Sequence, residues 1–203
     1  MSVRPPVLIV PTGVANLASV RAGLRRAGAD PRVEQDADAV ASAEFVVLPG
    51  VGAFGAGMAE LIGSELDGAV RARVEEDRPL LAVCLGMHLL CGSSEESPGV
   101  AGLGLVSQSV EHFPDAVRAP QFGWNRIEPG SGCRFLRSGY AYFANSYRLK
   151  VAPDGWRVAM ADHGGPFVAA MERGAVLACQ FHPELSGELG VGLMSRWLGG
   201  AEC

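Results

Sequence analysis

The first half of the chain alternates short apolar runs with stretches of helical periodicity. Three uninterrupted apolar runs, each short enough for a buried strand, occupy residues 7–10, 45–48 and 80–83. Asn16 favours the N-terminal cap of a helix, apolar residues recur after it at helical spacing, and Gly28 ends the pattern. A longer polar stretch, residues 58–77, predicts another helix. Strands without polar alternation, separated by helices, are typical of a parallel sheet covered on both faces.

The second half is richer in strands. They are predicted at residues 141–149, 157–161, 167–171 and 176–181. Leu189, Leu193 and Trp197 then recur at helical spacing and predict a closing helix. No repeat or long linker divides the 203 residues. We therefore expect a single three-layer α/β domain over residues 1–203, with an open mixed, mainly parallel sheet and helices on both faces.

Composition and charge narrow the classes of partner. The chain has 17 basic and 22 acidic residues, a net charge of −5 and a pI of about 5.4, which argues against a nucleic-acid-binding surface. No apolar run approaches the roughly 20 residues that a membrane-spanning helix needs, and the first run is too short for the core of a signal peptide. Five cysteines form no CxxC pair, as expected in a reducing compartment. The cytoplasm is the expected location, with no membrane partner.

Residues 82–86 have the pattern small-x-Cys-x-Gly of a nucleophile elbow. Such a sharp turn from strand to helix exposes the nucleophile, here Cys84, and aims the N–H group of Leu85 at the reacting carbonyl. A helix N-terminus also favours the reactive thiolate. The alternative is that Cys84 is simply a buried thiol, because free cysteine is among the most buried residue types. The remaining cysteines lack this setting and are interpreted as structural or surface thiols: Cys91, Cys133, Cys179 and Cys203.

The sequence His182-Pro183-Glu184 directly follows a predicted strand. A cysteine nucleophile needs a base, and the base needs an orienting partner. If the backbone is extended, positions two apart point the same way, so Glu184 could orient His182; otherwise the segment is a capped strand end with a solvated glutamate. His88 lies one helical turn after Cys84 and is a rival base. A Cys84–His88 metal pair would lack two further ligands, so no metal is expected.

Residues 50–55 fit the glycine pattern G-x-G-x-x-G after a strand. A dinucleotide site would also need an acidic residue about 20 positions on, at the end of the next strand, and none stands there. The segment is otherwise a tight turn, or a set of backbone N–H groups that binds a developing oxyanion. The glycines alone do not decide between these interpretations.

Taken together, LPGVGAFG at 48–55, CLGM at 84–87 and QFHPE at 180–184 resemble the class I (triad) glutamine amidotransferases. More narrowly, the chain resembles the family of glutaminase subunits of imidazole glycerol phosphate synthase, in histidine biosynthesis. Shorter matches extend the resemblance over nearly the whole chain: Gly13, Asn16-Leu17, Ser94-Glu95-Glu96, Gly123-Trp124-Asn125, Tyr142-Phe143, Ser146-Tyr147 and Ser186-Gly187.

The resemblance implies hydrolysis of L-glutamine to glutamate and ammonia, without a cofactor. Cys84 would be the nucleophile, His182 the base and then the acid, and Glu184 the orienting group. The oxyanion would be bound by N–H groups of Leu85 and of Val51 or Gly52. Glutamine contacts would come from His88, Glu96, Ser146 and Tyr147, and partner contacts from Asn16, Pro120, Trp124, Asn125 and Tyr142.

The partner implied by the resemblance is a (β/α)8-barrel synthase subunit that forms a heterodimer with this chain. It would use the ammonia to make imidazole glycerol phosphate and an aminoimidazole carboxamide ribotide. The resemblance also implies that the isolated subunit is nearly silent until its partner binds a nucleotide. Physically, this requires an oxyanion donor near Val51 and Gly52 that is misaimed until the partner changes it.

The chain departs from the family at several positions. The family usually has Gln at the position of His88, His at those of Gln121 and Asn145, Lys at that of Leu185 and Gly at that of Ala82. His88 and Leu185 motivate an alternative, a non-catalytic docking subunit of the same complex. A sibling amidotransferase subunit for anthranilate or pyridoxal phosphate synthesis is a further alternative, and Met87 and residues 49–55 argue against it.

Overall fold

The computed structural model describes residues 4–12 and 16–199, so Gly13 and Cys203 lie outside the described residues. Within this part, nine strands form one mixed sheet in the order β2-β1-β3-β4-β12-β11-β10-β7-β8. The parallel half consists of β1 (Pro6–Ile9), β2 (Asp30–Val33), β3 (Phe45–Leu48), β4 (Leu80–Val83) and β12 (Val176–Cys179). The antiparallel half consists of β7 (Gln121–Pro129), β8 (Gly139–Asn145), β10 (Arg157–Asp162) and β11 (Pro166–Arg173). None of the helices in the described ranges is long and apolar enough to cross a membrane.

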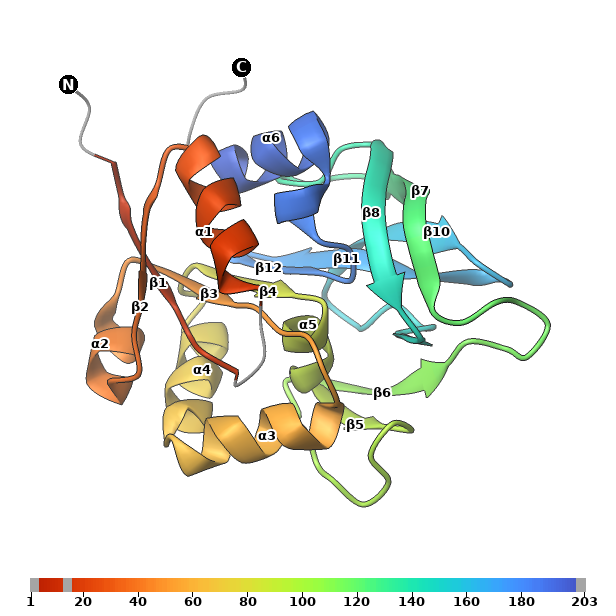
Figure 1. The fold of residues 1–203 in the computed structure, drawn as a ribbon, viewed down its shortest axis with the longest axis horizontal. Helices are drawn as coiled ribbons and strands as arrows, with labels where there is room; N and C mark the ends of the chain where they lie inside the picture. The colour runs from red at the N-terminus through yellow and green to blue at the C-terminus, as the bar shows by residue number, and fades with distance from the viewer. Residues whose placement is uncertain (1–3, 13–15, 200–203) are drawn as a thin grey trace.

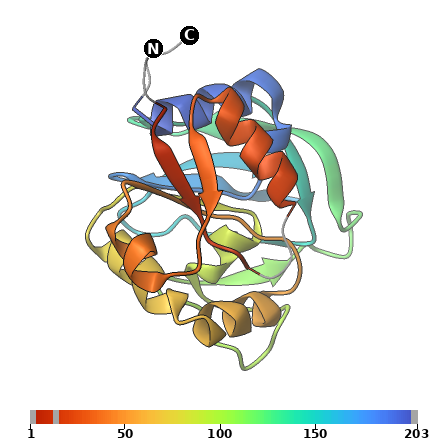
Figure 2. The ribbon, with the colours of Figure 1, turned by 60° about the vertical axis from the view of Figure 1, so that its left-hand side comes forward.

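Helices cover both faces of the sheet (Figures 1 and 2). One face carries α1 (Leu17–Arg26) and α6 (Gly187–Trp197). The other carries α2 (Ala37–Ser42), α3 (Phe54–Gly63), α4 (Leu66–Glu75) and α5 (Leu85–Leu89). Strand β3 shows why its apolar run is continuous: Phe45 and Val47 join the core under α1 and α6, whereas Val46 and Leu48 join the core on the opposite face. The expected three-layer α/β architecture is confirmed.

A small sheet lies beside α5 and is made of β5 (Cys91–Ser94), β6 (Val106–His112) and β9 (Tyr147–Arg148). Strand β6 pairs with β5 and also with β9, and His112 lies opposite Tyr147. The loop that follows β5 and the segment that follows β8 are therefore fixed to the same strand. Both segments carry residues that the resemblance assigns to glutamine binding.

Several predicted elements keep their place but change their bounds. Asn16 caps α1 as expected, and its Oδ1 accepts a hydrogen bond from the Ser19 N–H group at 3.2 Å. The single helix predicted over 58–77 is wrong, because α3 ends at Gly63 and Glu65 has a left-handed conformation with φ of 59° before α4. The strand predicted over 141–149 is divided between β8 and β9.

Candidate active site

The candidate nucleophile lies at a sharp turn between β4 and α5. Cys84 has φ of 54° and ψ of −108°, a conformation that costs energy for a residue other than glycine. The turn passes close to the end of β3, since a Cβ atom on Gly86 would lie 2.0 Å from the Leu48 carbonyl oxygen. A Cβ atom on Gly50 would likewise lie 2.7 Å from the Leu85 Cβ atom. Glycine at these positions lets the backbone hold Cys84 at the carboxyl edge of the sheet, the geometry of a nucleophile elbow.

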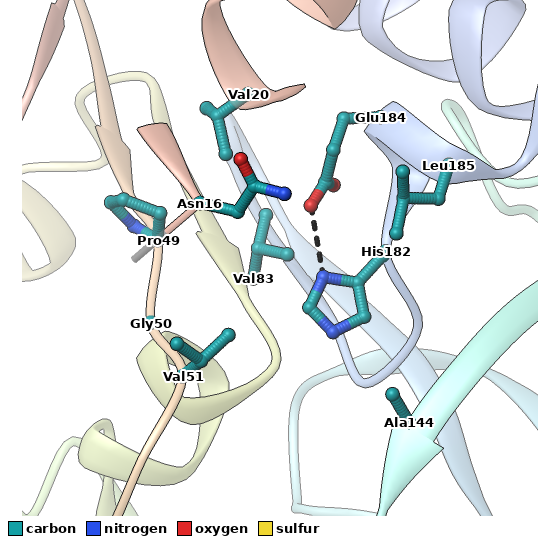
Figure 3. Close-up of a pocket in the computed structure, with 10 residues that line it drawn as sticks. All are labelled: Asn16, Val20, Pro49, Gly50, Val51, Val83, Ala144, His182, Glu184 and Leu185. Carbon is teal, nitrogen blue, oxygen red and sulfur yellow. Dashed lines mark hydrogen bonds and ion pairs between the residues drawn. The ribbon is translucent and has the colours of Figure 1, made fainter. Parts of the chain in front are cut away.

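His182 and Glu184 form a buried pair at the adjacent strand end. The distance from His182 Nδ1 to Glu184 Oε1 is 2.9 Å (Figure 3). Pro183–Leu185 form a 3-10 turn, so Glu184 reaches the ring through this turn, whereas the sequence pattern also allowed an extended backbone. Ser186 Oγ donates to the His182 carbonyl oxygen at 2.6 Å and accepts from the Tyr142 N–H group at 3.0 Å. The turn therefore anchors the histidine to β8.

Helix α1 fixes the position of Glu184 from behind. Arg26 Nη2 donates to the Glu184 carbonyl oxygen at 2.8 Å. Gly23 lies against the same residue, and a Cβ atom there would lie 2.8 Å from the Glu184 Cβ atom. Sequence analysis missed both contacts, because Arg26 and Glu184 are 158 positions apart. A glycine inside a helical pattern was the available signal, since glycine lowers helix stability unless close packing requires it.

The contacts of His182 favour its charged form. Burial alone would lower the pKa of the ring, but hydrogen bonds to Cys84 and Glu184 outweigh it and raise the pKa of His182 to about 10. The imidazole is therefore protonated at neutral pH. A protonated imidazole beside a thiol favours the thiolate, which is the nucleophilic form of cysteine.

One of the candidate oxyanion donors, the Leu85 N–H group, is not free to bind an oxyanion. The Leu85 N–H group donates to the Gly50 carbonyl oxygen at 3.3 Å, so it is already engaged. Gly52 has φ of +105°, which favours glycine at this position. Val51, Gly52, Cys84 and Leu85 line the same pocket. The segment after β3 therefore adjoins the nucleophile and occupies the donor that an oxyanion would need.

The loop after β5 caps helix α3, which begins directly after that segment. Glu96 Oε2 accepts from the Phe54 N–H group at 2.7 Å, and Ser97 Oγ accepts from the Gly55 N–H group at 2.9 Å. The preceding residue, Ala53, has no side chain that could cap the helix. Glu96 was expected as a glutamine contact, whereas the role of Ser97 was not predicted. Their partners stand 42 positions away in sequence, beyond the reach of a local pattern.

Two pockets meet at His182. The larger, of about 440 Å³, contains all four residues assigned to glutamine contacts: His88, Glu96, Ser146 and Tyr147. A smaller pocket of about 190 Å³ is lined by Asn16, Glu184 and Leu185 (Figure 3). Val51, Ala144 and His182 line both pockets. Across residues 4–12 and 16–199, no group of three or more His, Cys, Asp or Glu side chains is arranged to hold a metal ion.

Four of the residues expected at a partner interface lie on or next to β7 and β8, around an exposed aromatic face: Pro120, Trp124, Asn125 and Tyr142. The fifth, Asn16, caps α1 and lines the smaller pocket. The side chains of Phe122 and Trp124 are 69% and 57% exposed. The Trp124 ring packs edge-on against Tyr142, with 6.0 Å between ring centroids. Pro120 lines the larger pocket, and Asn125 Nδ2 donates to the Asp162 carbonyl oxygen at 2.8 Å. This face is thus continuous with the candidate site.

Two departures from the family pattern lie opposite each other. Gln121 on β7 pairs in register with Asn145 on β8, and both side chains are buried. Asn145 Nδ2 donates to the Tyr147 carbonyl oxygen at 2.9 Å, while Gln121 Oε1 and Asn145 Oδ1 accept no hydrogen bond. The two positions at which the resemblance leads us to expect histidines are therefore direct neighbours across the β7–β8 pair.

His88 is buried at the floor of the larger pocket. Its Nε2 atom lies 2.6 Å from Gln180 Oε1. Burial lowers the pKa of His88 to about 4, against a weaker opposite effect of the Gln180 hydrogen bond. The imidazole is therefore neutral at neutral pH, and it differs in this respect from His182.

A cysteine elbow with a buried His–Glu pair, on a sheet covered by helices on both faces, defines a class of enzyme. The chain belongs to the family Glutamine amidotransferase class-I, which it matches over residues 13–194. A solved structure described as a glutamine amidotransferase has the same fold, with a TM-score of 0.75 and 21% identity over 95% of this chain and 98% of that chain.

Two curated relatives within this family are subunits of imidazole glycerol phosphate synthase. The imidazole glycerol phosphate synthase subunit HisH of Symbiobacterium thermophilum is 41% identical over 196 residues, covering 94% of this chain and 92% of the relative. The subunit HisH of Escherichia coli strain K12 is 39% identical over 197 residues, covering 95% of this chain and 98% of the relative.

Proposed function

We propose that Cys84 hydrolyses the side-chain amide of L-glutamine and that the ammonia passes to a synthase partner. The observation that carries the proposal is the elbow cysteine beside the buried His182–Glu184 pair, in which His182 Nδ1 lies 2.9 Å from Glu184 Oε1. The chain is the glutamine amidotransferase subunit of imidazole glycerol phosphate synthase and acts in histidine biosynthesis, as its HisH relatives do. Residues 1–203 are proposed to form one amidotransferase domain, and the cytoplasm is the proposed compartment.

The reaction follows from the protonation states of the pair. The Cys84 thiolate attacks the amide carbon, and the carbonyl oxygen becomes an oxyanion. The protonated His182 ring gives its proton to the departing nitrogen, so that ammonia leaves and a thioester remains. The neutral ring then takes a proton from water as the hydroxide adds to the thioester. Collapse of this adduct expels the Cys84 thiolate and restores its pair with the protonated ring, while the product carboxyl loses its proton to solvent and leaves as glutamate. Glu184 holds the ring in orientation throughout and stabilises it in the steps in which it is charged.

The larger pocket supplies the contacts for the rest of the substrate. Glu96 is proposed to accept from the α-ammonium group, because a carboxylate has about four lone-pair sites and one is used by the Phe54 N–H group. Ser146 and Tyr147 line the pocket on the side of β8 and β9. The chemistry needs no cofactor, since a thiolate, an acid–base histidine and oxyanion donors are sufficient for amide hydrolysis.

The occupied donor at Leu85 supports regulation by the partner. While the Leu85 N–H group is bound to the Gly50 carbonyl oxygen, it is not available to an oxyanion. We propose that a partner contact moves residues 50–52, releases this N–H group and aims a second one from Val51 or Gly52. Removing a single oxyanion donor costs enzymes about 10²–10³ in kcat, so such a movement is enough to switch the activity.

The proposed partner is a (β/α)8-barrel synthase subunit in a heterodimer. The exposed aromatic face of Phe122 and Trp124 offers the apolar contact, and Leu185 is 41% exposed beside the smaller pocket. Asn16, Pro120, Asn125 and Tyr142 border this face or the pockets that open beside it. Ammonia released at His182 could leave through the smaller pocket, which His182 itself lines.

The experiment measures glutamate release from glutamine by the chain alone and with the barrel subunit plus its nucleotide ligand. We expect low activity alone, a large rise in the complex, and none in Cys84→Ala, which retains the fold. The absence of glutamate from a folded complex under both conditions would favour a docking subunit without catalysis. Full activity of the isolated chain would contradict regulation by the partner, but not the glutaminase assignment.

A further inference from the structure

Gln180 is a fully buried polar side chain that lies between two side chains of the candidate site. It follows β12, and its backbone N–H group donates to the Ala169 carbonyl oxygen at 2.8 Å. Gln180 Oε1 lies 2.6 Å from His88 Nε2, and Gln180 Nε2 lies 3.9 Å from Cys84 Sγ. The carboxamide therefore connects His88 with the reacting sulfur, although neither the mechanism nor the sequence pattern assigned it a role.

The direction of the hydrogen bond between His88 and Gln180 decides which end of the Gln180 carboxamide, oxygen or NH₂, faces the Cys84 sulfur. A neutral imidazole carries one N–H group. If the proton is on His88 Nε2, Gln180 Oε1 accepts it and the NH₂ group faces Cys84, as the structure has it. If the proton were on Nδ1, the carboxamide would turn over and present its oxygen to the sulfur. An oxygen lone pair repels a thiolate, whereas an N–H donor stabilises it.

We propose that His88 is a positioning residue, which fixes the Gln180 carboxamide so that its N–H group donates to the Cys84 thiolate. The inference rests on the proposed function of Cys84 and gives His88 a role other than the glutamine contact that the resemblance implies. The contact of 3.9 Å is long for the resting state, and it can shorten when the sulfur is charged because charge-assisted hydrogen bonds are shorter.

Local geometry makes the arrangement rigid. His88 lies one turn after Cys84 on α5, and its backbone N–H group donates to the Cys84 carbonyl oxygen at 3.3 Å. Burial keeps His88 neutral, with a pKa of about 4, so the hydrogen-bond chain does not change over the pH range of an assay. His182, with Glu184 behind it, contacts the sulfur, and two further titratable groups, Glu96 and Tyr147, line the same pocket as Cys84. Cys179 on β12 adjoins Cys84 through the backbone, since its carbonyl oxygen accepts from the Cys84 N–H group at 2.7 Å.

The test follows the pH dependence of alkylation of Cys84 by iodoacetamide in the full-length chain. The modified peptide that contains Cys84 is quantified by mass spectrometry, so that the other cysteines do not contribute. Because alkylation reports the thiolate and requires no glutamine, its outcome is independent of whether the chain hydrolyses glutamine. Glutamate release is measured in parallel, and the two proposals can therefore fail separately.

The variants separate positioning from packing. Gln180→Leu should move the alkylation midpoint upward by about one pH unit, a tenfold loss of thiolate at a fixed lower pH. His88→Phe should move it in the same direction by less, and His88→Gln should restore it, because a glutamine can donate to Gln180 Oε1 as the imidazole does. Adding His88→Phe to Gln180→Leu should have no further effect, since the group that His88 orients is gone.

An unchanged midpoint in Gln180→Leu would overturn the proposal, and so would additive shifts of the two substitutions. Thermal unfolding of each variant shows whether it is folded. Where Gln180→Leu does not fold, Gln180→Met takes its place, because it keeps the length and flexibility of glutamine without a hydrogen-bond donor.

Discussion

A single methyl group on helix α1 is expected to disturb catalysis from outside the substrate pocket. Gly23→Ala would place a Cβ atom 2.8 Å from the Glu184 Cβ atom, 3.0 Å from its Cα atom and 3.3 Å from Met194 Cε. Carbon atoms pack best at about 3.5–4.0 Å. Either α1 or the Glu184 turn must therefore move by about 1 Å, and Arg26 ties the two together.

The magnitude follows from two opposite effects on the free energy of unfolding. Alanine is about 1 kcal/mol more favourable than glycine inside a helix, and overpacking a core costs about 1–3 kcal/mol. The net loss of stability is therefore about 0–2 kcal/mol. The effect on catalysis is larger, because a shift of about 1 Å at Glu184 breaks its 2.9 Å hydrogen bond to His182. A misplacement of this size can lower a rate by about 10²-fold.

The assay compares kcat for glutamate release in the activated complex with the melting temperature of the chain. Gly68→Ala is the matched control, since Gly68 lies within α4 and a Cβ atom there has nothing within 4 Å. We expect Gly68→Ala to raise the melting temperature slightly with kcat unchanged, and Gly23→Ala to lower kcat by about 10–100-fold. Wild-type activity in a folded Gly23→Ala variant would refute the claim that α1 positions Glu184.

Further predictions concern the charges, the helix cap and the aromatic face. Glu184→Gln should lower kcat by about 10³–10⁴-fold and lower the pKa of His182, which a pH–rate profile will detect; an unchanged profile would argue against the pair. The pKa of His88 is about 4 in the folded chain and 6.5 ordinarily, so between these pH values the unfolded chain binds the proton more readily. The free energy of unfolding should therefore fall by about 3 kcal/mol as the pH drops from 6.5 to 4. Urea unfolding at several pH values should show this loss in the wild type and not in His88→Gln. Ser97→Ala should destabilise the chain by about 1 kcal/mol, because α3 loses a cap. It should also lower kcat more than it changes KM; an effect on KM alone would indicate that Ser97 contacts the substrate instead. Trp124→Ala should weaken binding of the synthase subunit by about 2 kcal/mol or more without changing the melting temperature. If a binding titration gives the variant the same affinity as the wild type, Trp124 does not lie in the interface.

Strands buried on both faces were predictable from the sequence, because a continuous apolar run has one simple interpretation. Both β3 and β4 lie where residues 45–48 and 80–83 placed them. The turn at Cys84 was also predictable, since small residues on both sides of a cysteine are a local requirement of the turn.

Elements with polar faces were not predictable in the same way. Strand β2 contains Pro31 and has one buried residue, as an edge strand allows. Strand β7 alternates buried and exposed positions irregularly and carries its aromatic side chains outward. The break between α3 and α4 depends on a left-handed Glu65, and a glutamate gives no warning of that conformation.

Contacts that complete the site were beyond a sequence argument for another reason. The hydrogen bonds from Phe54 to Glu96 and from Arg26 to Glu184 join residues 42 and 158 positions apart. No periodicity links such positions, because they meet only after the sheet has brought the elements together. Sequence analysis could therefore name the reacting groups, while the groups that hold them in place required the structure.

The position of β12 has a consequence for how the protein is made. This strand lies between β4 and β11, and so it joins the parallel half of the sheet to the antiparallel half although it is the last strand to be synthesised. Ribosomes add about 5–20 residues per second. Cys84 thus leaves the ribosome several seconds before His182. An unfinished chain therefore carries the Cys84 thiol without its base, His182. We expect it not to hydrolyse glutamine until β12 has joined the sheet.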